Sequence, residues 1–453
     1  MASIRNSSRE ISSLERRLRV QVRAREHRFA ALVPQELVSV CRREMESLGL
    51  NILEESEAGI EFQGKLEACY RANLWLRTAG RILCRLPAIK VGAREELFTK
   101  TVRFPWELWL NAQVPVRVEV HLKASRLTHS GLVQKAFQDA LRQRFEKLGQ
   151  KVSFLGEEPS AKERNEKTFL QGEALEACQR TRKSNHFPGS AGLRPAVCAG
   201  GTPALPERSP FSDRLFEQRI LVRVENKNCV ISLDTTGAHL HLRGYRIHHG
   251  GAPLRETLAA ALILQSGWTP DVPFLDGMCG AGTAVIEAAL IAANMAPGRH
   301  RRFLFEKWPS FQEKTWAYLL KKADAGIKDL KPGSLIGVDI DPKAVAIAQE
   351  NARRAGVASW VMWHEMPFES VNPLKWSLNP GVVFLNPPYG IRLEADHTLY
   401  KRLLLHLGHR FQGWKAIVLA PRRELLMSGA VRPRKIRHLR HGGLPIVAGY
   451  YDL

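Results

Sequence analysis

The sequence contains no run of apolar residues that approaches the roughly 18 residues of a membrane-spanning helix, so we expect no membrane partner. Its N-terminus also lacks the apolar stretch of a secretory signal, and Glu10, Glu15 and Glu26 do not suit a transit peptide. The seven cysteines include no C-x-x-C pair, which argues against a disulfide framework and a cysteine zinc site. Together these absences predict a cytoplasmic protein that holds no metal.

Acidic residues are scarce relative to basic ones. The 453 residues include 67 Lys and Arg against 45 Asp and Glu, which gives a net charge of +22. The excess is uneven: residues 1–27 hold seven Arg and three Glu, and residues 421–441 hold seven Lys and Arg against Glu424 alone. Clustered positive charge is typical of proteins that contact a polyanion, and nucleic acid is the first candidate.

The pattern along the first half of the chain predicts an arm, a folded block and an insertion. Residues 1–27 are polar and basic, and we expect a disordered arm. Residues 150–212 have no hydrophobic periodicity and are rich in Gly and Pro, which predicts a disordered insertion in a surface loop. The folded elements predicted around this insertion are helices over 34–48, 66–76 and 132–145, and strands over 60–62, 114–122, 220–224 and 230–233.

A βαβ rhythm organises the chain after residue 250. The predicted strands are 272–275, 334–338, 381–385 and 416–419, the predicted helices are 283–294 and 342–355, and a helical insertion is predicted over 311–330. Strands that alternate with helices of this length indicate a mostly parallel, doubly wound sheet. The chain is therefore predicted to be an α/β protein.

The stretch Asn386-Pro387-Pro388-Tyr389 follows a run of four apolar residues that reads as a buried strand. Proline cannot donate a backbone hydrogen bond, so the turn is stiff and its carbonyl acceptors remain free. The Asn386 side-chain oxygen and the Pro387 carbonyl could both accept from a planar amine, while Tyr389 offers a flat ring for stacking. The alternative is a plain strand-ending turn, because Asn-Pro is common in turns.

A glycine-rich turn, Asp276 to Thr283, follows the first predicted strand of the βαβ block. Gly280 and Gly282 allow the backbone to approach a ligand at the carboxyl edge, where open α/β sheets bind their ligands. The turn is not the G-x-G-x-x-G dinucleotide fingerprint, because Val285 stands at the third glycine position. Cys279 is interpreted as a small buried residue and not as a nucleophile.

Two aspartates follow the second predicted strand, and their spacing separates their roles. Asp341 precedes Pro342, so it is expected to cap the next helix, which Gly356 would end. Asp339 is then free to accept hydrogen bonds from ribose hydroxyls. It lies much further from Gly282 than the roughly 20 residues of a dinucleotide fold, which disfavours NAD(P). The ordered set of motifs instead predicts S-adenosylmethionine and an amine acceptor.

At this point the chain resembles class I RNA methyltransferases with an N-terminal THUMP region, in the branch that methylates N2 of guanine in bacterial large-subunit ribosomal RNA. The resemblance covers about 28–149 and 215–453. The stretches that carry it are 29–37, the L-H-L-R-G-Y-R string at 240–246, 253–260, 276–283, 339–341 and 386–390. It implies a ferredoxin-like plus THUMP α+β module over 28–250 and a Rossmann-like methyltransferase domain over 251–453. Some relatives carry a second, fused methyltransferase; the expectation here is a single activity.

The resemblance also assigns roles to the motif residues. The expected catalytic residues, which would hold and stack on the acceptor base, are Asn386, Pro387, Pro388 and Tyr389. The expected cofactor-binding residues are Asp276, Met278, Cys279, Gly280, Gly282, Thr283, Asp339, Ile340, Glu365 and Asn386. One position departs from the family pattern, since Pro367 stands where an acid usually binds the adenine amine. Glu365 or Glu369 could substitute for it.

Several alternatives stay open at the level of the sequence. The acceptor could be guanine N2 in transfer RNA, adenine N6 in nucleic acid or a protein glutamine, since these chemistries reuse N-P-P-Y. The chain could also be an RNA-binding ribosome assembly factor with weak catalysis, a reading that Pro367 favours. The histidines at 239, 241, 248 and 249 lack flanking acids, which disfavours a metal site. Glu287, on an apolar helix, is expected to pair with a backbone group, and the basic tail at 432–435 with RNA phosphate. The sequence gives no indication of oligomeric state.

Overall fold

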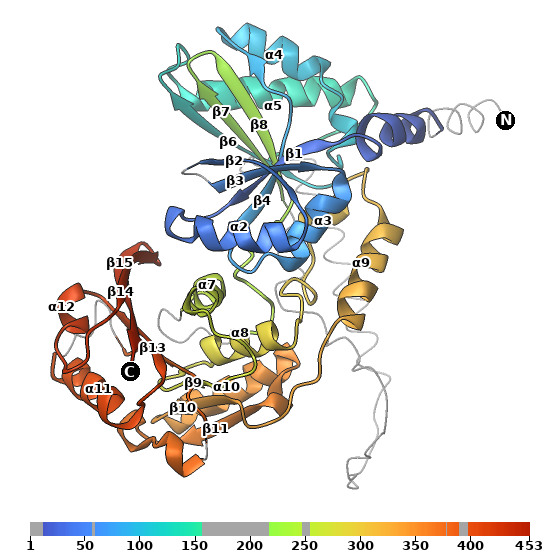
Figure 1. Ribbon diagram of the computed structural model, residues 1–453. Coiled ribbons are helices and arrows are strands. Elements are labelled where there is room, and N and C mark those ends of the chain that lie inside the picture. The colour runs from blue at the N-terminus through green and yellow to red at the C-terminus, as the bar shows by residue number, and fades with distance from the viewer. Residues whose placement is uncertain (1–11, 57–58, 156–216, 247–253, 377, 389–396) are drawn as a thin grey trace, which may run out of the picture.

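The computed structural model describes residues 12–56, 59–155, 217–246, 254–376, 378–388 and 397–453. Within these ranges the chain forms two sheets, each with its own helices, which lie at opposite ends of the molecule in Figure 1. None of the helices in the described ranges is long and apolar enough to cross a membrane.

The first sheet has eight strands, in the order β2-β3-β1-β4-β8-β7-β6, with β5 paired to β8 outside this path. All of its strand pairs are antiparallel except β6 with β7. The strands are β1 (His27–Leu32), β2 (Asn51–Ser56), β3 (Gly59–Gly64), β4 (Arg81–Arg85), β5 (Ile89–Lys90), β6 (Val116–Lys123), β7 (Gln218–Glu225) and β8 (Asn228–Asp234).

The chain order β1-α2-β2-β3-α3-β4 builds the ferredoxin-like half of this sheet. Its helices are α2 (Val38–Ser47), preceded by the short turn η2 (Gln35–Leu37), and α3 (Leu66–Trp75). Apolar residues spaced three and four apart, such as Val38, Cys41 and Met45, give α2 one buried face. Gly49, with φ of 61°, turns the chain after this helix, as its position in the sequence predicted.

The remaining strands and two helices extend the sheet from β4. The hairpin β7–β8 matches the predicted pair of strands, and Asn226, with φ of 55°, forms its turn. The helices are α4 (Arg94–Arg103), the turn η3 (Trp106–Leu108) and α5 (Ser130–Glu146). The alternating valines of β6 lie in the core, where Val116 and Val118 pack under α5.

Two predictions of disorder were too broad. Residues 12–23 are helical, ending in η1 (Leu18–Arg23), and Leu18 and Val22 are buried in the core of the first sheet. The apolar spacing of three to four residues outweighed the basic composition from which an arm was inferred. Residues 150–155 are also placed, because Phe154 bridges to Val116. Most of the predicted insertion, 156–212, lies outside the described residues.

The second sheet has seven strands in the order β11-β10-β9-β12-β13-β15-β14. Its first five strands are parallel, and the last two run antiparallel to their neighbours. The strands are β9 (Phe274–Asp276), β10 (Leu335–Asp339), β11 (Val361–Glu365), β12 (Val382–Leu385), β13 (Lys415–Ala420), β14 (Lys435–His441) and β15 (Leu444–Asp452). This mostly parallel α/β sheet agrees with the βαβ rhythm of the sequence.

The helices that follow β8 in the chain pack on both faces of the second sheet, except α9, which packs against α3 of the N-terminal part. They are α7 (Glu256–Ser266), α8 (Thr283–Ala292), α9 (Glu313–Ala325), α10 (Pro342–Ala355), α11 (His397–Arg410) and α12 (Arg423–Leu426), with the short turns η4 (Leu304–Lys307), η5 (Ala358–Trp360), η6 (Phe368–Ser370) and η7 (Pro373–Trp376). α7 and α8 are apolar on nearly every side, since almost all of their residues are buried. α7 lies between the two parts of the molecule (Figure 1) and packs against α8.

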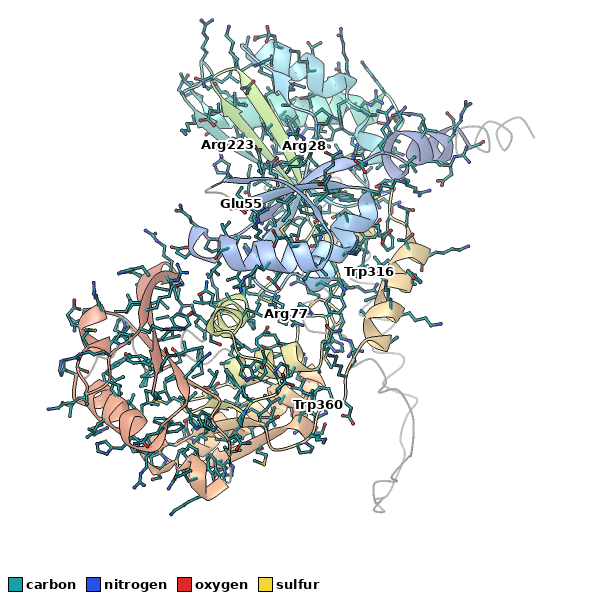
Figure 2. All side chains as sticks on the ribbon, viewed as in Figure 1. Arg28, Glu55, Arg77, Arg223, Trp316 and Trp360 are labelled. Carbon is teal, nitrogen blue, oxygen red and sulfur yellow. The ribbon has the colours of Figure 1, made fainter. Side chains whose placement is uncertain are left out.

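Aromatic packing joins the two parts of the molecule. The ring of Tyr70, on α3, stacks on Phe305 of η4 with centroids 4.5 Å apart, and Trp316 of α9 contacts both rings edge-on. Trp316 is labelled on α9 in Figure 2, beside the ferredoxin-like half. The helical insertion between β9 and β10 therefore attaches the second sheet to the N-terminal one.

A buried arginine makes the polar part of this junction. Arg77, at the centre of Figure 2, donates from Nη2 to the carbonyls of Leu290 (3.2 Å) and Met295 (2.8 Å) at the end of α8. Its own carbonyl accepts from Arg243 at 2.6 Å. Burial lowers the pKa of Arg77 to about 10, so the guanidinium stays charged at neutral pH.

We expect Arg77→Ala to lower the free energy of unfolding by about 2–4 kcal/mol, because two buried carbonyls lose a charged donor. Chemical denaturation with circular dichroism measures this loss. Arg43→Ala, at an exposed position of α2, is the matched control and should change stability by less than about 0.5 kcal/mol. Equal stability of the two variants would contradict the role given to Arg77.

Candidate active site

Four adjacent parallel strands bring the sequence motifs to one edge of the second sheet. In the pairing register Asp276 lies beside Phe384 of β12 and Gly337 of β10, and Asp339 lies beside Glu365 of β11. The glycine-rich turn, the acid after β10 and Asn386 after β12 therefore meet at the carboxyl ends of β9, β10 and β12. This is the edge where open α/β sheets bind ligands.

Backbone hydrogen bonds hold the glycine-rich turn against both neighbouring strands. The N–H of Gly277 donates to the Phe384 carbonyl, and the N–H of Cys279 donates to the Val338 carbonyl, each at 2.9 Å. Gly282 has φ of 80°, and a Cβ there would meet Ala348 at 2.9 Å. Gly280, with φ of 52°, has nothing within 4 Å of a Cβ position, so the turn is open on that side.

Asp339 is held by backbone donors on both carboxylate oxygens. Oδ2 accepts from the N–H of Gly280 at 2.8 Å, and Oδ1 accepts from the N–H of Asp341 at 3.0 Å. Each oxygen has a second lone pair, so the carboxylate can still accept from a ligand. Asp341 caps α10 by accepting from the Lys343 N–H at 2.9 Å, and the helix ends at Gly356, as predicted.

Asp276 is the buried acid of the site. Burial raises the pKa of its carboxyl group to about 8, and the charge of Asp339 acts in the same direction against hydrogen bonds to the backbone of Val285 and Met278. Among the described residues its Oδ1 has no hydrogen-bond partner. An unpaired buried carboxyl oxygen is costly, so it marks a place for a donor from a ligand.

The other residues predicted to bind the cofactor in or near the glycine-rich turn (276–283, below called the cofactor turn) differ in their chemical environment. Burial raises the pKa of Cys279 well above its usual range, so its thiol is neutral and not a nucleophile. The Thr283 hydroxyl, predicted to face the cofactor, is the acceptor of a hydrogen bond from Arg246. Met278 is half-buried, and Ile340 is 66% exposed at the end of β10, where an apolar ring could cover it.

Asn386 begins the turn after β12. Its Oδ1 is buried and has no hydrogen-bond partner in the described part of the chain. Pro387 is buried and Pro388 is exposed, so the turn passes from the core to the surface within two residues. Tyr389, the predicted stacking residue, lies outside the described residues, and its role stays a prediction.

The region around Pro367 distinguishes the two substitute acids. Pro367 is exposed and immediately precedes η6, two residues after the end of β11. Glu365 is the exposed last residue of β11, in register with Asp339 on the ligand-binding edge. Glu369 instead pairs with Arg402 of α11 at 3.5 Å. Glu365 is therefore the better placed of the two acids for an adenine amine.

Sequence reasoning gave no role to the polar cluster that supports the cofactor turn. Arg246 pairs with Glu256 at 3.4 Å and also donates to Thr283, the first residue of α8. Burial raises the pKa of Glu256 to about 7, although the charge of Arg246 opposes this. The R-G-Y-R string at 243–246 could have indicated this cluster, but in the sequence analysis it served only as evidence of the family resemblance.

One further expectation concerned Glu287. Glu287 was expected to pair with a backbone group, which was wrong: its Oε1 lies 3.4 Å from Arg243 Nε and 3.3 Å from the Tyr245 hydroxyl. Two side chains that the string at 240–246 brings together replace the backbone partner.

Within the described ranges no three His, Cys, Asp or Glu residues are grouped as for a metal, and residues 248 and 249 lie outside those ranges.

Comparison with known proteins matches two separate segments of the chain. Residues 28–83 match an RlmL ferredoxin-like domain, and residues 243–446 match the family described as RMKL-like, methyltransferase domain. A putative RNA methyltransferase of Bacillus subtilis, YpsC, is 30% identical over 385 residues, which is 84% of each chain. The chain belongs to the RMKL-like methyltransferase family.

Other relatives of this methyltransferase differ in length. A putative RNA methyltransferase of Synechocystis is 28% identical over 433 residues, 94% of this chain and 96% of the relative. The ribosomal RNA large subunit methyltransferase K/L of Allochromatium vinosum is 33% identical over 430 residues, 92% of this chain and 50% of the relative. The chain spans about half the length of the K/L relatives.

Solved structures agree with the fold of this methyltransferase. The crystal structure of SMU.472, a putative methyltransferase complexed with SAH, has a TM-score of 0.71 at 27% identity and covers 94% of this chain and 98% of its own. A predicted N6-adenine-specific DNA methylase from Listeria monocytogenes also has a TM-score of 0.71, at 28% identity, and covers 94% of this chain and 96% of its own. The strand order of the second sheet is that of class I methyltransferases, whose cofactor is S-adenosylmethionine.

The described residues fit S-adenosylmethionine. The open side of the Gly280 turn gives backbone access to the ligand, and the unpaired oxygen of Asp276 can accept from its ammonium group. Asp339 is fixed where it can accept from ribose hydroxyls, and exposed Ile340 can cover the adenine. The bound cofactor supplies a sulfonium methyl group; the protein residues supply orientation.

The pKa of Asp276 predicts how stability without ligand depends on pH. The folded protein keeps this carboxyl protonated up to about pH 8, whereas the unfolded chain loses the proton near its ordinary pKa of 3.8. The stabilising contribution is therefore full below that value and is lost as the pH rises toward 8, by up to about 1.4 kcal/mol per pH unit. We expect Asp276→Asn to remove this slope in denaturation measurements between pH 5 and 8. Identical pH profiles for both proteins would contradict the assignment.

Of the two acids near Pro367, only Glu365 is predicted to contribute to cofactor affinity. We expect Glu365→Gln to raise the Kd for S-adenosylmethionine about tenfold, because a carboxylate acceptor on the binding edge is lost. Glu369→Gln is the matched control and should leave the Kd unchanged. Isothermal titration calorimetry measures both values; a larger effect at Glu369 would show that the acid has been misassigned.

Proposed function

We propose that this methyltransferase transfers a methyl group from S-adenosylmethionine to the exocyclic N2 amine of a guanosine in RNA, most specifically in large-subunit ribosomal RNA. The observation that supports an amine acceptor is the buried Asn386 oxygen, which lacks a partner and follows a strand beside the cofactor turn. The Pro387 carbonyl offers the second acceptor of the same turn.

The chemistry requires orientation more than activation. The N2 lone pair is delocalised into the guanine ring, and two acceptors on the amine hydrogens hold it in line with the methyl carbon. A bond forms between nitrogen and carbon while the carbon–sulfur bond breaks, and its electron pair neutralises the sulfonium. The extra proton on nitrogen then leaves to solvent. Orientation of two reactants can contribute several kcal/mol, and the base must leave its stack to reach this turn.

The RNA substrate is supported by the relatives and by charge. The Bacillus and Synechocystis relatives are named as RNA methyltransferases, and the K/L relatives act on large-subunit ribosomal RNA by name. The net charge of +22 suits a polyanionic substrate. We also propose a domain division at residues 250/251, with the helical residues 12–23 belonging to the N-terminal part, a THUMP module in that part, and a cytoplasmic location.

Two observations favour particular alternatives. The Listeria structure is named as a predicted N6-adenine methylase, and adenine N6 would present the same amine geometry to Asn386. Pro367, in place of an acid, favours a chain that binds cofactor weakly and acts in ribosome assembly. Transfer RNA would use the same guanine chemistry. Mass spectrometry of nucleosides from RNA treated with the protein separates N2-methylguanosine from N6-methyladenosine.

We expect Asn386→Ala to abolish methyl transfer, because the amine loses its side-chain acceptor, while RNA affinity changes less than about twofold. Tritium transfer from labelled cofactor and filter binding measure the two properties. Asn386→Asp, which keeps an oxygen at the position, should retain part of the activity. A parallel loss of transfer and RNA binding in Asn386→Ala would contradict a role in orienting the amine.

A further inference from the structure

A cavity at the junction of the two parts of the molecule is separate from the cofactor turn. It has a volume of about 90 Å³, and its walls come from the loop around η2, from residues 78–80, from the segment at 239–241, from the first turn of α7 and from β14. A water molecule needs roughly 10–15 Å³ on this measure, so the cavity can take a group the size of a phosphate.

The charges around this cavity favour an anion. Arg255, the residue before α7, and Arg440 of β14 both line the cavity, and both residues are exposed. Glu36 is the one acid among the lining residues. Thr78 adds a hydroxyl to the wall, although its Oγ1 already donates to Glu44. The first turn of α7 also lies here, and the N-terminal end of a helix favours negative charge.

Two uncharged histidine rings, stacked on each other, lie beside the arginines. His239 and His241 stack with centroids 5.6 Å apart and ring planes 23° from parallel. Burial lowers the pKa of His241 to about 3, and the charge of Arg255 acts in the same direction, so this ring is neutral at physiological pH. The position of His239 is fixed by Arg81, whose Nη2 lies 3.3 Å from its Nε2. Neutral aromatic faces of this kind stack on nucleobases.

The cavity is connected to the cofactor turn through two paired residues, Glu256 and Arg246. Arg255 and Thr257 line the cavity, and Glu256 between them pairs with Arg246. Arg246 in turn donates to Thr283 at the start of α8, which follows the cofactor turn directly. A group bound in the cavity is thus held by the same short segment that supports the cofactor turn.

Exposed basic residues continue from the cavity along the edge strand of the second sheet. β14 is the last strand in the sheet order and contacts η2 of the N-terminal part. Lys435, His438 and Arg440 are exposed along it. The basic tail that the sequence suggested for phosphate contact therefore continues into the cavity, and a nucleic-acid strand lying along β14 would reach Arg440.

We propose that this cavity binds the phosphate of one nucleotide of the substrate RNA between Arg255 and Arg440, and that the base of this nucleotide lies outside the cavity, on the exposed ring of His239. The inference rests on the proposed RNA substrate and names a contact outside the catalytic turn. Because both parts of the molecule line the cavity, the bound nucleotide fixes the RNA to both of them while the target base enters the active site.

The test uses the full chain with Arg255→Gln and Arg440→Gln combined, and Arg353→Gln as the matched control. Arg353 is an exposed arginine of α10 that pairs with Glu350 and lies outside the cavity. We expect the double variant to bind a ribosomal RNA fragment about tenfold more weakly in filter binding. The slope of log K against log salt should become shallower by about one unit for each lost phosphate contact.

Further measurements separate binding from folding and from catalysis. The double Arg→Lys variant keeps both charges and should recover most of the RNA affinity. Calorimetry should give an unchanged Kd for S-adenosylmethionine. His239→Ala should lower RNA affinity about threefold with no change in the salt slope, because it removes stacking area and not charge.

Three results would overturn the inference. The first is wild-type RNA affinity and salt slope in the double Gln variant. The second is an affinity loss that the Lys variant does not recover. The third is competition by inorganic phosphate without any RNA defect in the Gln variant, which identifies a small-anion site. The identity of the methylated nucleoside does not enter these readouts, so a product other than N2-methylguanosine would reject the proposed function and leave this test standing.

Discussion

The parallel pairing of β9 with β10 on one side and β12 on the other is the constraint on which the active site depends. Parallel strands end at the same edge, so Asp276, Asp339 and Asn386 meet there although they are far apart in sequence. The turn after β9 donates backbone hydrogen bonds to both neighbours, which fixes its distance from each. Any displacement of β12 would therefore separate Asn386 from the glycine-rich turn.

The buried polar cluster behind this edge has a second task. Arg243, Arg246 and Tyr245 belong to a short segment between the two sheets, and they reach Glu287, Glu256 and Thr283 in the methyltransferase part. Arg243 also donates to the carbonyl of Arg77 in the N-terminal part. Buried ion pairs contribute little net stability but are sensitive to geometry. This cluster thus makes the relative position of the two parts, and not only their stability, a property of specific side chains.

Features of the fold and the site that depend on residues close in sequence could be predicted, whereas those that depend on tertiary contacts could not. Local signals sufficed for α10, since Asp341, Pro342 and Gly356 set its ends within one segment. The motifs also placed the acid of β10 and the turn after β12 on one edge, because parallel strands share it. The helix at 12–23 was missed, since its burial by the first sheet is a tertiary contact that composition does not show. The same holds for Arg246, whose partners lie 10 and 37 positions further along the chain.

The junction between the two parts gives the N-terminal half a physical role beyond supplying charge. Its aromatic contacts through Tyr70 and Trp316, and the buried Arg77, fix one sheet against the other. If RNA binds to both parts, as proposed, little conformational entropy is lost in ordering the protein, because the two surfaces are already fixed relative to each other. The proposed orientation of a target amine by Asn386 requires that the rest of the RNA be held rigidly with respect to this residue. The fixed junction, with Arg255, Arg440 and the neutral histidine rings in its cavity, would hold the RNA in place at a site separate from the active site.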